Sequence, residues 1–412
     1  MSRPDLIDRL ATAQAERARQ DLVRRLRKVE SVDGMRIQID GKTLLNFASN
    51  DYLGLAQHPA LREALIAGAK TWGVGATAAH LLGGHREEHA ALEEKLARWT
   101  GRERALLFST GYMANLGAIQ ALLGETDVCV QDKLNHACLL DGAKLAGCEL
   151  KRYVHADVAS AQRQLASRPD AAALLATDGV FSMDGDAAPL AELAALCKKQ
   201  HATLMVDDAH GLGVLGNEGA GSLVDAGLKQ DIAPVLMATL GKALGVAGAF
   251  VAGSATLIDG LVQFARTHIY TTAMPPALAA ATSVAIDIAR FEDWRRLKLA
   301  RLIVHFRRGA AERGIVLLDS HTPIQPVLVG ESGAALDAAK YLETLGFFVP
   351  AIRPPTVAQG KARLRITLSA LHEEAEVEGL LNVLARAVAR AHPRTRLRAS
   401  APARARRKGP TR

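Results

Sequence analysis

Between about residues 48 and 290, short apolar runs alternate with stretches of helical periodicity, and this alternation constrains the fold more than any other feature. Strands are predicted at 105–109, 128–131, 174–177, 204–206, 235–239 and 248–252. Helical patterns lie between them, for example over 88–100, which is closed by Gly101, and over 190–200. Strands that alternate with helices form mostly parallel sheets covered on both faces. We therefore predict an α/β fold built on a largely parallel sheet.

The flanking segments have a different texture. Residues 5–30 are predicted as one amphipathic helix, followed by strand-like stretches over 35–40 and 44–47. Beyond about 291, helices are predicted over 294–312, 334–345 and 373–390. Strands are predicted between them, over 324–329 and 362–369. We expect an N-terminal helix with a short β segment over 1–47 and a large domain over 48–290. A smaller C-terminal α+β domain is expected over 291–393, followed by a disordered basic tail over 394–412.

The positive charge of the chain is confined to its C-terminal tail. The chain has 51 Lys and Arg against 43 Asp and Glu, a net charge of +8. Eight basic and no acidic residues fall within 394–412, so the rest of the chain has 43 of each sign. A basic surface is the usual mark of a nucleic-acid-binding protein. The balanced body therefore weakens that interpretation, and the tail is expected to be a solvated extension rather than a docking element.

The sequence also argues against export and membrane insertion. It contains no run of about 18 apolar residues, so no transmembrane helix is expected. The first 20 residues carry charges throughout and lack the apolar core of a secretory signal. None of the four cysteines forms a CxxC pair, and they are Cys129, Cys138, Cys148 and Cys197. Free thiols in a cytoplasmic protein are favoured over disulfides or a metal site.

Polar residues follow two of the predicted strands, where ligands bind in sheets of this kind. Strand 204–206 leads into Asp207 and His210. An aspartate leaving a buried strand is costly unless its charge is used. Asp207 therefore either caps the next helix or holds a proton on a heterocyclic ligand nitrogen, with His210 close to the same ligand.

Lys242 follows strand 235–239 and is flanked by glycines and apolar residues. Burial lowers the pKa of an amine and makes it a nucleophile toward carbonyls, although most lysines are surface charges. Residues 109–115 join a strand to a helix, and the N–H groups at a helix start suit a phosphate, although an ordinary turn has the same pattern. A phosphate cradle, an aspartate and a buried lysine are together the parts that a pyridoxal phosphate enzyme needs.

These residues lie in segments that resemble the α-oxoamine synthases, a family of the pyridoxal-phosphate-dependent aspartate-aminotransferase superfamily. The matching segments are FASNDYLGL (47–55), ALLFSTGYMAN (105–115), DKLNHACLLDGA (132–143), DGVFSMDGDAAPLAEL (178–193), LMVDDAHGLGVLG (204–216), TLGKALGVAG (239–248), YTTAMPP (270–276) and AIRPPTVAQGKARLRITLSA (351–370). The resemblance spans about 47 to 370. It implies the type I fold of these transferases, pyridoxal 5'-phosphate as cofactor and a homodimer with a shared active site.

The resemblance also assigns roles to individual residues. Lys242 would form the Schiff base, Asp207 would pair with the pyridinium nitrogen, His210 would lie near the phenolic oxygen and His136 would stack on the ring, although without the motif His136 would be a core histidine. Further cofactor contacts are implied at Gly111, Tyr112, Ser182 and Thr239, and, from the neighbouring subunit, at Thr271 and Thr272. Substrate contacts are implied at Arg365, which would receive the α-carboxylate, and at His136, Arg24, Arg353 and Thr356. Arg24 has neighbouring registers at Arg25 and Arg27, and a solvated helix charge is the alternative for it.

The implied reaction is the decarboxylative condensation of an amino acid with an acyl thioester. Several segments favour L-alanine with a pimeloyl thioester, carried by coenzyme A or an acyl carrier protein. The alternatives are a relative that uses glycine or serine with another acyl group, an aminotransferase on the same fold, and a non-catalytic subunit. Two positions depart from the family pattern, His80 where arginine is common and Leu212 where threonine is frequent, and both bear on acyl specificity.

Overall fold

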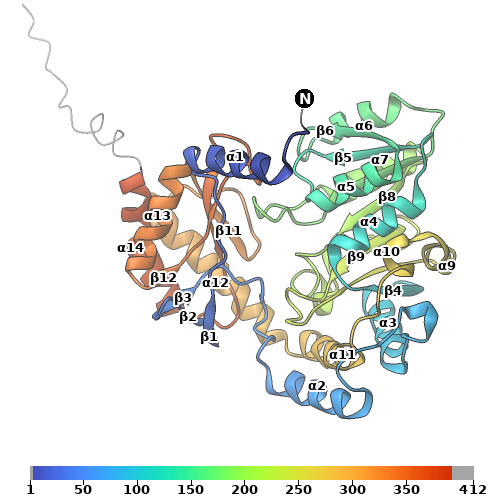
Figure 1. Cartoon of the computed structure of the whole chain (residues 1–412), viewed down its shortest axis with the longest axis horizontal. Helices are drawn as coiled ribbons and strands as arrows, with labels where there is room; N and C mark the ends of the chain where they lie inside the picture. The colour runs from blue at the N-terminus through green and yellow to red at the C-terminus, as the bar shows by residue number, and fades with distance from the viewer. Residues whose placement is uncertain (1–2, 392–412) are drawn as a thin grey trace, which may run out of the picture.

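A seven-stranded sheet carries the central part of the chain in the computed structural model, which describes residues 3–391 (Figure 1). Its strands are β4 (Arg104–Phe108), β5 (Val128–Asp132), β6 (Glu149–Tyr153), β7 (Ala173–Asp178), β8 (Thr203–Asp207), β9 (Val235–Thr239) and β10 (Ala249–Gly253). They lie in the order β4-β10-β9-β8-β7-β5-β6, and only β10 runs antiparallel to its two neighbours. The predicted, mostly parallel sheet is therefore confirmed.

Both faces of this sheet are buried, because successive residues of a strand point to opposite sides. Leu107, Val130 and Val206 belong to one hydrophobic core, while their neighbours Leu106 and Cys129 belong to another on the other side. The helices on the side of Leu106 are α4 (Gly111–Leu122), α5 (Ala137–Ala146), α9 (Ala255–Phe264) and α10 (Arg266–Ile269). The remaining helices of this part are α2 (Pro59–Trp72), α3 (Glu87–Thr100), α6 (Val158–Ala166), α7 (Leu190–Lys199), α8 (Ser222–Asp225) and α11 (Pro276–Phe291), with the 3₁₀ turns η1 (His80–Leu82) and η2 (Asn217–Gly219).

The C-terminal elements pack beside the N-terminal strands and form two small sheets (Figure 1). One is antiparallel, with the order β11-β14-β13, and the other has the order β1-β2-β3-β12. Their strands are β1 (Val29–Asp33), β2 (Arg36–Ile39), β3 (Lys42–Asn46), β11 (Ile324–Gly330), β12 (Phe347–Phe348), β13 (Ala351–Ile352) and β14 (Ala362–Thr367). The helices are α12 (Asp293–Glu312), α13 (Ser332–Thr344) and α14 (Glu374–Ala391). The predicted tail, 394–412, lies outside the described residues.

The N-terminal helix is shorter than predicted. Helix α1 spans Leu6–Arg19 and buries none of its residues, whereas the sequence predicted a helix over 5–30. The chain turns at Asp21, whose φ of 56° lies in the left-handed region that aspartate tolerates. Arg353 donates hydrogen bonds to the carbonyls of Asp21 and Val23, so contacts with the C-terminal part hold the next segment in an irregular conformation. Tertiary contacts thus override the helical periodicity here.

Two further expectations concern the cysteines and the membrane. All four cysteines are free, and only Cys148 is not fully buried. Among residues 3–391 no helix is long and apolar enough to cross a membrane.

Candidate active site

Lys242 and His210 meet at the carboxyl ends of two neighbouring parallel strands. Lys242 follows β9, His210 follows β8, and the Lys242 Nζ lies 2.9 Å from the His210 Nε2. The other ring nitrogen of His210, Nδ1, lies 2.6 Å from the hydroxyl of Tyr52, which is fully buried. Parallel strands place such loops at one edge of the sheet, so residues far apart in sequence form one constellation.

Burial favours the neutral forms of this lysine and this histidine. It lowers the pKa of the Lys242 amine below its usual 10.5, an effect that the nearby charges of Asp207 and Asp178 partly oppose. Burial also lowers the pKa of His210 well below 6.5, and the neighbouring Lys242 adds to this. An unprotonated amine is the form that attacks a carbonyl carbon or accepts a proton. The site therefore holds a lysine prepared for covalent chemistry.

Asp207 ends β8 as a buried carboxylate with no cationic partner among the described residues. Its side chain accepts hydrogen bonds from the Asn115 Nδ2 at 2.7 Å and from the N–H of Ala209 at 3.0 Å. The residue is 5% exposed. Asp207 thus bonds its own loop instead of capping a helix, and its charge remains available to a ligand that brings a protonated nitrogen.

The adjacent aspartate, Asp208, holds the loop that carries His210. Its two oxygens accept hydrogen bonds from the hydroxyl of Ser222 at 2.6 Å and from its N–H at 2.8 Å. Position 211 is glycine because a Cβ there would lie 2.1 Å from the Asp208 Oδ1. The close approach of the backbone to this buried carboxyl therefore fixes where His210 stands.

Two residues without a predicted role belong to the site. Asn115, in the first turns of α4, donates to Asp207, and its Oδ1 is buried without a partner in the described part of the chain. Asp178 ends β7 beside Asp207 and accepts a hydrogen bond from the N–H of His136 at 3.1 Å. Burial, reinforced by the charge of Asp207, raises the pKa of Asp178 well above its usual range. The rule that drew attention to Asp207, an aspartate leaving a buried strand, applies equally to Asp178.

His136 lies at the start of α5 and is not a core histidine. It is exposed, and its Nδ1 accepts a hydrogen bond from the N–H of Cys138 at 3.3 Å. Its ring stands nearly perpendicular to the ring of Tyr112, with centroids 6.5 Å apart. The bond to Asp178 ties its backbone to the same strand end as Asp207.

The N-terminus of α4 lies beside Thr239. The hydroxyl of Thr110 accepts a hydrogen bond from the N–H of Met113 at 3.2 Å, while the N–H groups of Gly111 and Tyr112 find no acceptor within residues 3–391. A Cβ added at Gly111 would lie 3.8 Å from the Cβ of Thr239, so these two predicted cofactor residues adjoin each other. Free N–H groups at the start of a twelve-residue helix suit a phosphate.

Arg365 is a buried arginine that no carboxylate in the described part of the chain neutralises. It is 5% exposed, and its Nε donates to the backbone carbonyl of Ser182 at 2.6 Å. Its terminal nitrogens donate to Asn50 at 3.3 Å and to Thr367 at 3.0 Å. A buried cation held only by neutral groups is stabilised by an anionic ligand, and its planar fork suits a carboxylate.

The other predicted substrate residues form a second group at the N-terminal segment. Arg24 donates to the hydroxyl of Thr356 at 3.3 Å, and Arg353 holds the backbone just before it. Arg27 has a different role, because it pairs with Asp40 at 2.8 Å and with Glu343 at 2.6 Å. The structure therefore places Arg24, rather than Arg27, beside Thr356.

Thr271 and Thr272 have no recorded contact with the lysine and its neighbours in the described residues. Thr272 is exposed and bridges to Ala79. Their contact with a neighbouring subunit stays a prediction. Of the two departures from the family pattern, Leu212 is buried in the core, and His80 lies beside His85 and His89.

Comparison of the sequence with known protein families first identifies the class of protein to which this chain belongs. The model of the family called aminotransferase class I and II matches residues 42–384, and the chain belongs to this family. Within it, the chain is similar to proteins called 8-amino-7-oxononanoate synthase. One from Pseudomonas putida is 56% identical over 379 residues, which cover 91% of this chain and 96% of the relative.

Solved structures confirm the predicted fold class. A serine palmitoyltransferase from S. paucimobilis with PLP and myriocin bound superimposes with a TM-score of 0.89 at 27% identity, covering 94% of this chain and 99% of its own. An 8-amino-7-oxononanoate synthase from Francisella tularensis superimposes with a TM-score of 0.74 at 28% identity, covering 84% of this chain and 98% of its own.

Proposed function

We propose that this protein is a pyridoxal-phosphate-dependent acyltransferase. It joins L-alanine to a pimeloyl thioester and releases CO₂ and the carrier thiol. The product is 8-amino-7-oxononanoate, in a step of biotin biosynthesis. The observation that carries the proposal is the 56% identity to a protein of that name over nearly its whole length. The reaction needs a nucleophilic amine, a fixed negative charge and a carboxylate receptor, and Lys242, Asp207 and Arg365 supply groups of these kinds.

The side chains present fit pyridoxal phosphate. A buried carboxylate without a cation, at Asp207, suits a protonated ring nitrogen, and the free N–H groups of Gly111 and Tyr112 suit a phosphate. Thr239 and Ser182 would add hydroxyl contacts, and Thr271 and Thr272 would reach the phosphate from a second copy of the chain. When bound, the cofactor supplies an electron-withdrawing ring that stabilises negative charge on the alanine Cα.

Lys242 both holds the cofactor and moves the proton in this proposal. Burial lowers the pKa of its amine and so favours the unprotonated Nζ that attachment requires. With alanine bound at the site, the Lys242 Nζ would accept the proton from the alanine Cα. His210, at 2.9 Å, orients the amine, and Tyr52 fixes the His210 ring through its other nitrogen. His136 would cover one face of the ring and so exclude water from it.

Arg365 and the N-terminal segment bind the two substrates. The guanidinium of Arg365 would receive the carboxylate of alanine, which is later lost as CO₂. Arg24, Arg353 and Thr356 lie together where the chain from α1 meets the C-terminal part, and we assign them to the acyl thioester. The carrier is coenzyme A or an acyl carrier protein. We assign the enzyme to the cytoplasm, a compartment in which free thiols persist.

The serine palmitoyltransferase likeness does not change the choice of substrate. The serine palmitoyltransferase has a higher TM-score, 0.89, than the Francisella protein. Both proteins, however, are less than 30% identical to this chain. A shared fold hosts many substrates, so backbone similarity says little about which amino acid is used. Identity of 56% is the stronger guide.

A product assay tests the proposal directly. Alanine, glycine and serine would each be incubated with pimeloyl, acetyl, succinyl and palmitoyl thioesters, with pimeloyl offered on both carriers. We expect CO₂ and 8-amino-7-oxononanoate from alanine with pimeloyl thioester, and a loss of about 10-fold or more with glycine, since one methyl group is worth that much in a fitted pocket. Preference for glycine, or amino transfer to a keto acid without CO₂ release, would reject the assignment.

A further inference from the structure

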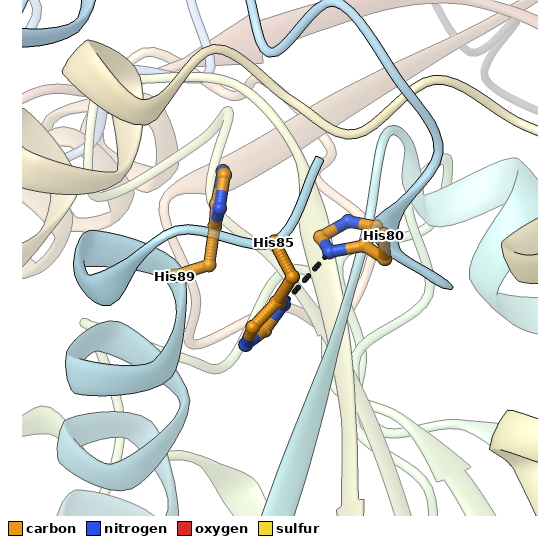
Figure 2. A group of neighbouring side chains, drawn as sticks. All are labelled: His80, His85 and His89. Atoms are coloured by element: carbon orange, nitrogen blue, oxygen red, sulfur yellow. Dashed lines mark hydrogen bonds between the residues drawn. The ribbon is translucent and has the colours of Figure 1, made fainter. Parts of the chain in front are cut away.

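Three histidines gather where α3 begins, and none of them takes part in the site described above (Figure 2). His80 lies in η1, His85 in the loop that follows and His89 in the first turn of α3. One ring nitrogen of each lies within 4.8 Å of the other two. We propose that this histidine triad binds a divalent transition-metal ion. The proposal is independent of the reaction assigned to Lys242.

His80 and His85 present the same ring nitrogen to each other. Their Nδ1 atoms are 2.9 Å apart, and Figure 2 shows the two rings directed at one another. Zinc–nitrogen bonds are about 2.0–2.1 Å long, which puts two ligands of a tetrahedral ion about 3.3 Å apart. A small opening of the pair therefore converts a shared hydrogen bond into two metal bonds.

Burial favours the neutral form of these imidazoles, which is the form that binds metals. Burial lowers the pKa of His80 to about 3, and it lowers the pKa of His85 and His89 as well. Neutral imidazole offers a lone pair, which imidazolium does not. An ion would leave the rings uncharged, and the proton of the shared Nδ1 hydrogen bond would move to the second nitrogen of its own ring.

A carboxylate stands behind His85. The Glu93 Oε2 lies 3.7 Å from the Nε2 of His85, and the other oxygen of Glu93 accepts a hydrogen bond from the N–H of Leu107 at 2.9 Å. Ligating histidines commonly donate their second N–H to a carboxylate, which fixes the tautomer and turns the lone pair of the first nitrogen to the ion. In this chain that first nitrogen is the Nδ1 that faces His80.

His89 is the third ligand, and it has to exchange a hydrogen bond for the ion. Its Nδ1 accepts from the N–H of Arg86 at 2.8 Å, and its Nε2 donates to the carbonyl of Met274 at 2.8 Å. His80 and His85 therefore supply the first two bonds, and His89 completes a three-histidine set. Such a set leaves a fourth position for water.

The ion has a path to the site and a definable chemistry. His85 is exposed and borders a cleft of about 430 Å³, whose lining includes Glu93 and Arg102. Imidazole nitrogens favour Zn²⁺, Ni²⁺ or Cu²⁺, whereas Mg²⁺ and Ca²⁺ require oxygen ligands. The triad therefore discriminates between these two groups of metals.

A bound ion would brace the segment that carries Thr272. His89 bonds the carbonyl of Met274, the N–H of Ala273 donates to Ala78 at 3.0 Å, and Ala79 bridges to Thr272. Joining η1 to α3 through metal would lock both sides of this segment. The ion is thus assigned a structural role.

Calorimetric titration of the tag-free, pyridoxal-phosphate-loaded protein with Zn²⁺ tests the proposal, because a polyhistidine tag would itself bind the metal. We expect one ion per chain, a higher melting temperature with Zn²⁺, and neither effect with Mg²⁺. His85→Ala should abolish both effects. His321→Ala, which removes a histidine that is 83% exposed and outside the triad, should change neither. Glu93→Gln should weaken binding by about 10-fold.

The proposal fails if the unaltered protein binds no Zn²⁺, or if His85→Ala binds it equally well. His85→Gln repeats the test with a side chain of similar size in case the alanine variant is unstable. The absorbance of the bound cofactor reports whether each variant is folded, and this keeps a folding defect apart from loss of a ligand. Binding is measured without turnover, so failure here and failure of the proposed reaction are distinguishable.

Discussion

Asp178 and Asp207 are register partners at the ends of β7 and β8. Both are buried, at 4% and 5% exposure. Two adjacent buried carboxylates are costly to ionise together. Burial and the charge of Asp207 raise the pKa of Asp178, so Asp178 takes up a proton more readily than it otherwise would. Asn115 donates a hydrogen bond to Asp207 at 2.7 Å, and such a bond stabilises negative charge on the carboxyl that accepts it.

Replacing each aspartate by asparagine should therefore have unequal effects. Asp178→Asn keeps an uncharged group that accepts the His136 N–H bond, so kcat should stay within about 10-fold of its original value. Asp207→Asn removes the fixed charge, and kcat should fall by about 100-fold or more, the usual loss for one preorganised electrostatic group. Steady-state kinetics on both variants measures this. Equal losses would show that Asp178 is charged as well.

The lowered pKa of Lys242 should set the pH dependence of cofactor attachment. Only the unprotonated amine reacts, so the rate of pyridoxal phosphate uptake by the apoprotein should rise with pH and level off below 10.5. Asp207 raises this pKa and Arg365 lowers it. Asp207→Asn should thus move the profile to lower pH, and Arg365→Gln to higher pH. Stopped-flow absorbance records the profile, with Lys242→Ala as the variant that shows neither attachment nor product.

Arg365→Lys should raise the KM for alanine by about 10- to 100-fold, the value of a hydrogen bond to a charged group. The matched control is Arg363→Lys, on the same strand and equally buried, because the charge of Arg363 is already paired with Asp184 at 2.7 Å. That variant should leave the KM for alanine unchanged. If both variants change it equally, the effect comes from β14 as a whole and not from carboxylate binding.

Arg24→Ala should raise the KM for the acyl thioester by several-fold and leave the KM for alanine as it is. Its control, Arg25→Ala, removes the neighbouring exposed charge, which has no recorded partner within residues 3–391, and should alter neither KM. Kinetics at saturating levels of the other substrate separates the two values. An effect at Arg25 alone would move the contact one residue along the chain.

Truncation after Pro393 should leave both activity and affinity for the acyl carrier unchanged. The removed residues lie beyond the family match, which ends at residue 384, and they contain the eight basic residues that give the chain its net charge. Low ionic strength is the stringent condition, because electrostatic docking would be strongest there. A rise in KM only at low salt would reveal a docking role.

The local pattern of apolar residues was sufficient to predict most strands of the large sheet, but not all of them. Six of the strands in the large sheet were predicted from short apolar runs that end within about two residues of the observed bounds. Strand β6, with the sequence ELKRY, lies at the sheet edge and is half exposed, so it lacks such a run. The end of α1 was missed for another reason, since Arg353 fixes the chain after Asp21 from more than 300 residues away.

The site was predictable where one rule applied locally and a motif supported it. Lys242, Asp207 and His210 follow strands directly, and their mutual distances come from strand adjacency. The role of Asn115 could not be predicted in this way, because Asn115 and its partner Asp207 are 92 residues apart in the sequence. The triad at His80 appeared in the sequence only as a single unusual residue, since a 3₁₀ turn and a helix start bring its members together.

The parallel pairing of β3 with β12 has a consequence for how the chain is made. Leu45 lies opposite Phe347 and Asn46 opposite Phe348, and the N–H of Thr367 donates to the carbonyl of Phe47 at 2.8 Å. The large sheet has all its strands once residue 253 has been synthesised. Strand β3 thus leaves the ribosome early but cannot pair with β12 until nearly the whole chain has been synthesised. The hydrogen bond from Arg24, just upstream, to Thr356 has the same requirement.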